Sequence, residues 1–165
     1  MAKRSSKKTA ITKQDVLDAQ DRWVKAIVNI GHAYTSGENV VETAKSCIES
    51  LYAYGDGDVL FKPTKCETRQ FRPTFEGALS YFVGNDFAPF GFSEDGGFAI
   101  APYVSVQFMN AGIIVDGARA IAMGNYFFTK TNGETIKVEY SFGYRLRGSD
   151  VVIDVHHSSL PFQNE

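Results

Sequence analysis

The chain has 165 residues, enough for one domain with a single core, because chains of about 150 residues bury about two-thirds of their unfolded surface. Its composition of 44% hydrophobic and 22% charged residues is ordinary for a globular protein. The formal net charge is −2, but five basic residues lie within residues 1–13, and without them it is −7. The mildly acidic body argues against a nucleic-acid partner. No apolar run approaches the roughly 18 residues that cross a membrane.

The basic start, residues 1–11, is predicted to be a disordered tail, although it could also touch an acidic surface. Residues 12–165 are predicted to form one domain. Residues 1–10 lack the apolar stretch of a secretory signal. Cys47 and Cys66 are not spaced as a metal pair, so we expect free thiols in a reducing compartment. The expected location is the cytoplasm, or the plastid stroma if an algal transit peptide has been removed.

The first half of the domain is predicted to be mainly helical. The expected elements are a helix over 12–35, a helix over 39–54, a strand over 59–64 and a short helix over 74–82. Apolar residues spaced by three and four support the first helix, and Thr12 with Asp15 resembles a capping box. Cys47 lies within the second helical pattern and is expected to pack as a small hydrophobe.

The second half is predicted to be an antiparallel sheet after a structured loop over 85–97. The expected strands are 98–115, with a bend near Pro102, 118–130, 134–146 and 150–159. Asp116-Gly117 and Asn132-Gly133 are strong hairpin signals, because both pairs tolerate positive φ. Helices gathered before such a sheet define the α+β class.

Strand alternation predicts which side chains point inward. In the third of these strands, Tyr140 and Tyr144 fall on the apolar face. In the last strand, regular alternation places His157 and Ser159 on the apolar face and His156 and Ser158 on the opposite one. We therefore expect Tyr140, Tyr144, His157 and Ser159 to point into the space that the helices leave.

Five segments together resemble the iota class of carbonic anhydrases, a class within the nuclear-transport-factor-2-like, cystatin-related superfamily. They are residues 59–65, 71–83, 122–128, 138–144 and 156–161, and with their spacing they cover 15–163. The run His-His-Ser-Ser-Leu-Pro at 156–161 is the most specific. The chain is also similar to the association domain of calcium/calmodulin-dependent kinase II.

The resemblance implies a cone-shaped fold, a homodimer, and reversible hydration of CO2 to bicarbonate, with CO2, bicarbonate and water as the partners. It implies pocket hydroxyls from Thr64, Tyr81 and either Ser158 or Ser159. Strand alternation favours Ser159, together with His157. The other residues expected around the substrate are Ser158, His156, Tyr140 and Tyr144.

The histidines do not suggest a zinc site. Catalytic zinc needs three protein ligands and an open position, and the chain has only His32, His156 and His157. Neighbours on a regular strand face opposite ways, so His156 and His157 should not share a metal unless the strand bends. Some members of the family are metal-free, whereas metal dependence has been claimed for others. We predict neither a metal nor another cofactor.

A mechanism without zinc cannot rely on ionised water. Zinc lowers the pKa of bound water from about 15.7 to about 7, which is worth roughly 12 kcal/mol. Hydroxyls alone cannot do this, so we expect a concerted step in which Thr64, Tyr81 and Ser159 orient water and CO2. Neutral His157 would accept the proton. The alternative is that His157 is an interior histidine and that these hydroxyls are structural.

Two other functions remain open at this stage. A non-catalytic oligomerising module would use the outer sheet face as its contact surface. A cone-shaped isomerase would need an inward carboxylate as its base, but Glu139 and Asp154 both fall on the outward face by alternation.

Overall fold

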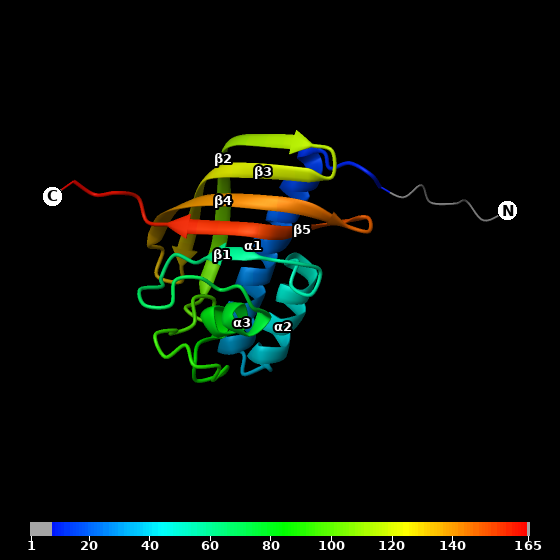
Figure 1. The fold of residues 1–165 in the computed structure, drawn as a ribbon. Helices are drawn as coiled ribbons and strands as arrows, with labels where there is room; N and C mark the ends of the chain where they lie inside the picture. The colour runs from blue at the N-terminus through cyan, green and yellow to red at the C-terminus, as the bar shows by residue number, and fades with distance from the viewer. Residues whose placement is uncertain (1–7, 165) are drawn as a thin grey trace.

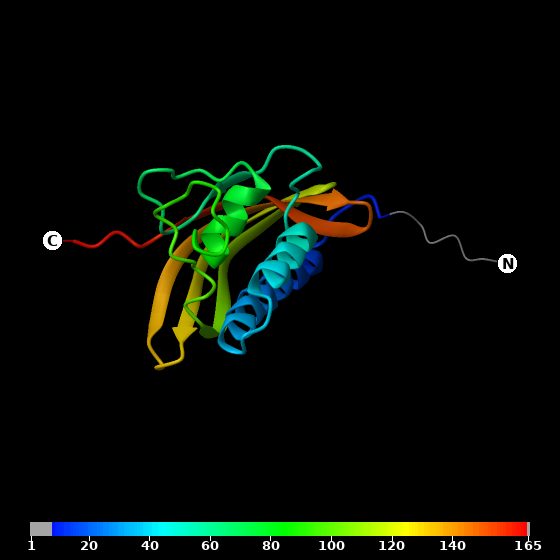
Figure 2. The ribbon, with the colours of Figure 1, turned by 90° about the horizontal axis from the view of Figure 1, so that it is seen from below.

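The structure is a computed structural model that describes residues 8–164. These residues form three helices and five strands (Figure 1): α1 (Lys13–Thr35), α2 (Val40–Leu51), β1 (Leu60–Lys62), α3 (Phe75–Val83), β2 (Tyr103–Asp116), β3 (Arg119–Lys130), β4 (Thr135–Arg147) and β5 (Asp150–Ser159). The strands make one sheet in the order β1-β5-β4-β3-β2. β1 is parallel to β5, and the other neighbours are antiparallel. Figure 2 shows the curved sheet with the helices on one side of it. The architecture is the α+β arrangement predicted from the sequence.

Helix α1 begins with the predicted capping box. The Thr12 side chain accepts a hydrogen bond from the Asp15 amide, and the Asp15 carboxylate accepts one from the Thr12 amide at 2.7 Å. Ile11, directly before the cap, is 4% exposed and its amide donates to the Gly117 carbonyl at 2.8 Å. The packed body therefore starts before Thr12, while residues 1–7 of the predicted tail lie outside the described residues.

The segment before β2 is not a strand, contrary to the expectation of one strand over 98–115 with a bend near Pro102. β2 begins only at Tyr103. The amides of Phe98 and Ala99 donate to the carbonyls of Tyr81 and Phe82 at 2.8 and 2.9 Å. These bonds satisfy carbonyls at the end of α3 and hold the segment against that helix, away from the sheet ladder.

Strand β5 carries one extra residue. Gly143 of β4 pairs with Val155 and Tyr144 pairs with Ile153, which leaves Asp154 unmatched in a β-bulge. The bulge reverses the alternation of side chains beyond it, so His156 and Ser158 are buried whereas His157 is exposed. The expectation that His157 and Ser159 point inward is wrong, because it assumed a regular strand.

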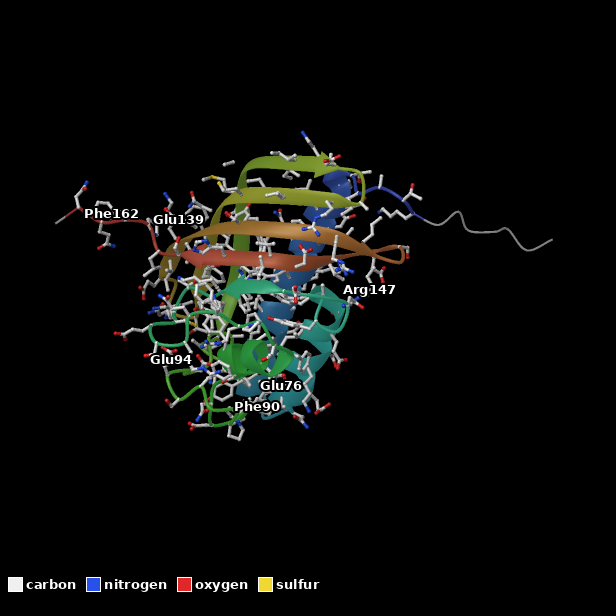
Figure 3. The ribbon with its side chains drawn as sticks, viewed as in Figure 1. Glu76, Phe90, Glu94, Glu139, Arg147 and Phe162 are labelled. Carbon is white, nitrogen blue, oxygen red and sulfur yellow. The ribbon has the colours of Figure 1, made fainter. Side chains whose placement is uncertain are left out.

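The loops on both sides of α3 are tied to that helix by buried charges. Arg72 and Asp95 form an ion pair at 2.7 Å, with both side chains 0% exposed. Asp95 also accepts a hydrogen bond from the Ser80 hydroxyl at 2.8 Å. Glu94, labelled in Figure 3, accepts the backbone amides of residues 67–69 at 2.7 to 3.0 Å. These contacts hold the loop that follows β1 against the helix that carries Tyr81.

Candidate functional site

A small, partly open cavity lies where α1 and α3 approach β1, β3 and β5 of the sheet. Its lining residues are Trp23, Phe61, Pro63, Thr64, Tyr81, Phe82, Phe98, Tyr126, His156 and Ser158. It offers about 10 Å³ to the centre of a water-sized sphere, about the room that one water needs. Four hydroxyls and one imidazole from distant parts of the chain therefore share one hollow.

Parallel pairing of β1 with β5 brings Thr64 to the cavity. Phe61 lies opposite His156 in this register, and their rings stack with centroids 4.6 Å apart. Thr64 follows β1 and is half-buried. Tyr81 comes from α3, and its hydroxyl accepts the Lys65 amide at 3.4 Å. The sheet edge and α3 thus place the two hydroxyls that the sequence had predicted for the site.

His156, Ser158 and Tyr126 form a buried triangle of hydrogen-bonding groups. Nε2 of His156 lies 3.0 Å from Oγ of Ser158 and 3.2 Å from the Tyr126 hydroxyl. The Tyr126 and Ser158 hydroxyls are in direct contact. On the other side of the ring, Nδ1 of His156 lies 2.8 Å from the Tyr52 hydroxyl, which accepts the Trp23 indole N–H at 2.9 Å.

The site is uncharged near neutral pH. Burial lowers the pKa of His156 well below its ordinary value, and the nearby His157 acts in the same direction. Burial raises the pKa of Tyr81 well above its ordinary value. It also raises the pKa of Tyr126, although hydrogen bonds to Ser158 and Thr64 oppose that rise. The cavity can therefore act on a substrate through neutral hydrogen bonds.

Two of the residues predicted to be catalytic, His157 and Ser159, lie outside the cavity. His157 is exposed on the outer face, and Ser159 donates its hydroxyl to Glu139 there at 2.8 Å (Glu139 is labelled in Figure 3). The family resemblance did not distinguish whether Ser158 or Ser159 supplies the pocket hydroxyl, and the structure places Ser158 at the cavity. His156 replaces His157 for the same reason, the bulge in β5.

Tyr140 and Tyr144 point inward as predicted, at 2% and 1% exposure, but neither lines the cavity. The Tyr140 hydroxyl donates to the Asn110 side chain at 2.5 Å. Asn110 in turn exchanges two hydrogen bonds of 2.8 Å with Gln20 of α1. Alternation predicted their face correctly but could not predict which part of the interior they would reach.

Three site residues were not predicted as such: Trp23, Tyr52 and Tyr126. Each carries a polar atom within the interior, and a buried tyrosine or tryptophan usually finds a hydrogen-bond partner for that atom. That rule is the one signal in the sequence that could have drawn attention to them.

A wider cleft of about 260 Å³ lies next to the cavity and shares Tyr81 and Phe98 with it. Its other lining residues are Lys65, Glu94, Asp95, Gly96, Gly97, Ala101 and Tyr103. Tyr81 and Phe98 stack with ring centroids 5.4 Å apart between the two spaces. This aromatic pair therefore separates the cavity from the cleft.

Residues 8–164 contain neither a cluster of metal-ligating side chains nor a helix that could span a membrane. No three His, Cys, Asp or Glu side chains in this range gather closely enough to hold a metal ion. No helix in the described part of the chain is both long and apolar enough to cross a membrane.

The fold is shared with solved structures of low sequence identity. An NTF-2-like protein of unknown function from Shewanella oneidensis is 11% identical, with a TM-score of 0.53 and coverage of 90% of this chain and 99% of that one. A structure assigned as a calcium/calmodulin-dependent protein kinase II association domain, from Xanthomonas campestris, is 22% identical, with a TM-score of 0.51 and coverage of 93% and 94%. The chain thus has the nuclear-transport-factor-2-like fold that the sequence predicted.

The family is defined by closer matches. The model of the metal-independent carbonic anhydrase family matches residues 14–160. A metal-independent carbonic anhydrase from Nostoc sp. (strain PCC 7120) is 39% identical in an alignment of 158 residues that covers 93% of this chain and 76% of that protein. The crystal structure of a cyanobacterial iota-carbonic anhydrase complexed with bicarbonate is 38% identical, with a TM-score of 0.89 and coverage of 95% and 96%. The chain belongs to the metal-independent carbonic anhydrase family, and the resemblance stated from its motifs is confirmed.

Proposed function

We propose that this chain hydrates CO2 reversibly to bicarbonate in the cavity that Thr64, Tyr81, His156 and Ser158 line. Its membership of the metal-independent carbonic anhydrase family confirms the enzyme class predicted from the sequence. The observation that carries the assignment to this cavity is the convergence of four hydroxyls and a neutral imidazole in one buried space. The related cyanobacterial structure holds bicarbonate.

The neutral groups act by orientation and hydrogen bonding. Hydroxyl hydrogens directed at the oxygens of CO2 stabilise the negative charge that develops on them as water attacks the carbon. Water forms the new C–O bond and loses one proton. Thr64 is the half-buried member of the set and gives that proton a path toward solvent through exchanging hydroxyls. This path replaces the predicted role of His157 as proton acceptor, because His157 lies on the outer face.

Substrate binding requires the hydroxyls to separate. The cavity has room for about one water molecule, whereas CO2 and bicarbonate have three and four heavy atoms. The direct contact between Tyr126 and Ser158 closes the space between them. Rotation of the Ser158 side chain about χ1 would move its hydroxyl away from Tyr126 and make room for the substrate, which would enter from the wider cleft past Tyr81 and Phe98.

Replacing the two adjacent serines one at a time tests this site. Ser158→Ala removes a hydroxyl from the cavity and should lower kcat for CO2 hydration by about 100-fold or more, as loss of one donor to a developing oxyanion does. Ser159→Ala changes the same atom one residue away on the outer face and should keep the wild-type rate. Stopped-flow measurement of both gives the comparison. A Ser158→Ala rate equal to wild type would reject this cavity as the site.

We also propose the homodimer and the location predicted from the sequence. Four apolar side chains on the outer face of β2 and β3 support a contact between two copies: Met109, Ile114, Ile121 and Met123, which are 53% to 70% exposed. Cys47 and Cys66 are free thiols, as expected for the cytoplasm or a plastid stroma. Imaging of the tagged protein in its source cells tests the location.

A further inference from the structure

The Nδ1 side of His156 is held by a chain of two residues, Trp23 of α1 and Tyr52, the residue that directly follows α2. Trp23 of α1 donates its indole N–H to the oxygen of the Tyr52 hydroxyl at 2.9 Å, and that hydroxyl lies 2.8 Å from Nδ1. Trp23 and Tyr52 are each 1% exposed. Within residues 8–164, the Tyr52 hydroxyl has no other hydrogen-bond partner. Nδ1 is therefore the acceptor available to the hydrogen of that hydroxyl.

The directions of these bonds follow from a count of hydrogens. An indole N–H can only donate, so the Tyr52 oxygen accepts from Trp23. The hydrogen of the Tyr52 hydroxyl then needs an acceptor, which Nδ1 supplies when it carries no hydrogen. With a hydrogen on Nδ1, the Tyr52 hydroxyl hydrogen would be buried without a partner. That arrangement should be disfavoured by about tenfold or more.

We infer that Trp23 and Tyr52 hold His156 as the neutral tautomer with its hydrogen on Nε2. The inference deepens the proposed function and rests on it for its catalytic meaning. Tyr52 is a positioning residue, since it acts on the cavity through His156. His156 then faces the cavity as a donor, because an Nε2 that carries hydrogen cannot accept the proton of the attacking water.

This tautomer leaves the cavity with a spare hydrogen. Nε2–H donates to Ser158 or to Tyr126, and the hydroxyls of these two residues share one bond. The Ser158 and Tyr126 hydroxyls each carry one hydrogen, but the hydrogen bond between them uses only one of the two. The other hydrogen must therefore point out of the triangle. That hydrogen is available to the Thr64 hydroxyl or to a ligand, and a ligand that takes it must offer an acceptor, as the oxygens of CO2 and bicarbonate do. In the opposite tautomer Nε2 would accept a hydrogen bond from one of the two hydroxyls. Both hydroxyl hydrogens, of Ser158 and Tyr126, would then be used within the triangle, and neither would be left for a ligand.

Nitrogen NMR of the wild-type protein tests the tautomer directly. Protein labelled with ¹⁵N in its histidine rings distinguishes a nitrogen that carries hydrogen from one that does not. His32 and His157 are exposed and provide references within the same sample. We expect His156 to show a bare Nδ1 and a protonated Nε2 between about pH 6 and pH 8. A protonated Nδ1, or an even mixture of tautomers, would overturn the inference.

Two neighbouring tyrosines provide a matched pair of variants. Tyr52→Phe removes the hydroxyl that bonds Nδ1. Tyr54→Phe removes a hydroxyl that donates to the Arg72 carbonyl at 2.7 Å and does not touch His156. We expect Tyr52→Phe to give mixed His156 tautomers and a kcat about tenfold lower with little change in KM, the effect of one lost buried hydrogen bond. Tyr54→Phe should keep the wild-type tautomer and kcat.

These measurements separate the inference from the proposed function. A wild-type protein with the Nε2–H signature and no CO2 hydration would reject the function and keep the tautomer. A wild-type protein that hydrates CO2 and carries its hydrogen on Nδ1 of His156 would reject the inferred tautomer but leave the proposed function standing. A folded Tyr52→Phe variant with unmixed Nε2–H and the wild-type kcat would show that Tyr52 has no positioning role.

Discussion

At the scale of single residues, adjacent positions on β5 have opposite roles. His156 is 3% exposed and bonded at both ring nitrogens, whereas His157 is exposed to solvent. Ser158 and Ser159 differ in the same way. Each face of β5 carries one histidine and one serine. The chemistry of the site therefore depends on which member of each adjacent pair points toward the cavity.

The buried His156 should make folding depend on pH. Its pKa is lowered well below its ordinary value by burial, while in the unfolded chain it titrates near 6.5. Below about pH 6.5 the unfolded state therefore binds more protons than the folded state, so stability is complete above that pH and falls as the pH decreases. The contribution of this residue is at most about 1.4 kcal/mol per pH unit.

Urea unfolding between about pH 8 and pH 5 checks this expectation. His156→Gln should reduce the loss of stability on acidification, although it lowers stability overall. His32→Gln, at a histidine with 70% side-chain exposure, should leave the pH dependence unchanged. Equal slopes for wild type and His156→Gln would contradict the assignment.

At the scale of elements, the bulge in β5 decides the composition of the site. Asp154 is the extra residue, and it pairs with Arg119 of β3, not with any group in the cavity. Gly143 lies opposite the bulge, where a Cβ would come within 2.8 Å of the Cβ of Val155. Because Gly143 has no side chain, β4 and β5 can approach closely where the bulge shifts their pairing.

Gly143→Ala should disturb this register. The added methyl group would have to displace Val155, and overpacking of this kind costs about 1–3 kcal/mol. CO2 hydration should fall as well, because the displaced Val155 lies on β5 directly before His156 and Ser158. Gly112→Ala is the control, because a Cβ at that position meets nothing within 4 Å. Thermal unfolding and stopped-flow rates of the two variants give the test, and a Gly143→Ala protein as stable and active as Gly112→Ala would contradict it.

At the scale of the whole molecule, the sheet has two different faces. One packs on the helices and contributes Tyr126, His156 and Ser158 to the cavity. The other exposes an apolar patch on β2 and β3 that includes Ile114 and Ile121, which pair directly across the two strands. Exposed apolar patches of this kind mark interaction surfaces, which is the basis for the proposed homodimer.

A charge placed in the patch should prevent dimerisation. We expect the wild type to sediment as a dimer and Ile121→Lys as a monomer, because an unpaired lysine in an apolar interface loses its hydration. Leu17→Lys changes an exposed apolar residue of α1, outside the patch, and should remain dimeric. Sedimentation velocity of the three proteins checks this. A monomeric wild type, or a dimeric Ile121→Lys variant, would contradict the proposed surface.

Much of the fold followed from local patterns in the sequence. The capping box at Thr12, the hairpin turns and the apolar stripe of α1 all rest on interactions between residues close in the chain. The segment 98–102 was predicted to be the first part of a strand with a bend near Pro102. It bonds instead to the end of α3, a contact that no local pattern contains.

The sequence by itself determined the fold class and the family, and it predicted two residues that line the cavity, Thr64 and Tyr81, because these inferences depend on periodicity and on motifs. Only the tertiary structure decided that His156 and Ser158 face the cavity while His157 and Ser159 do not. The physical reason is the single unmatched residue at Asp154, which shifts the register between β4 and β5. Side chains alternate with a period of two, so an insertion of one residue exchanges the faces of every position beyond it.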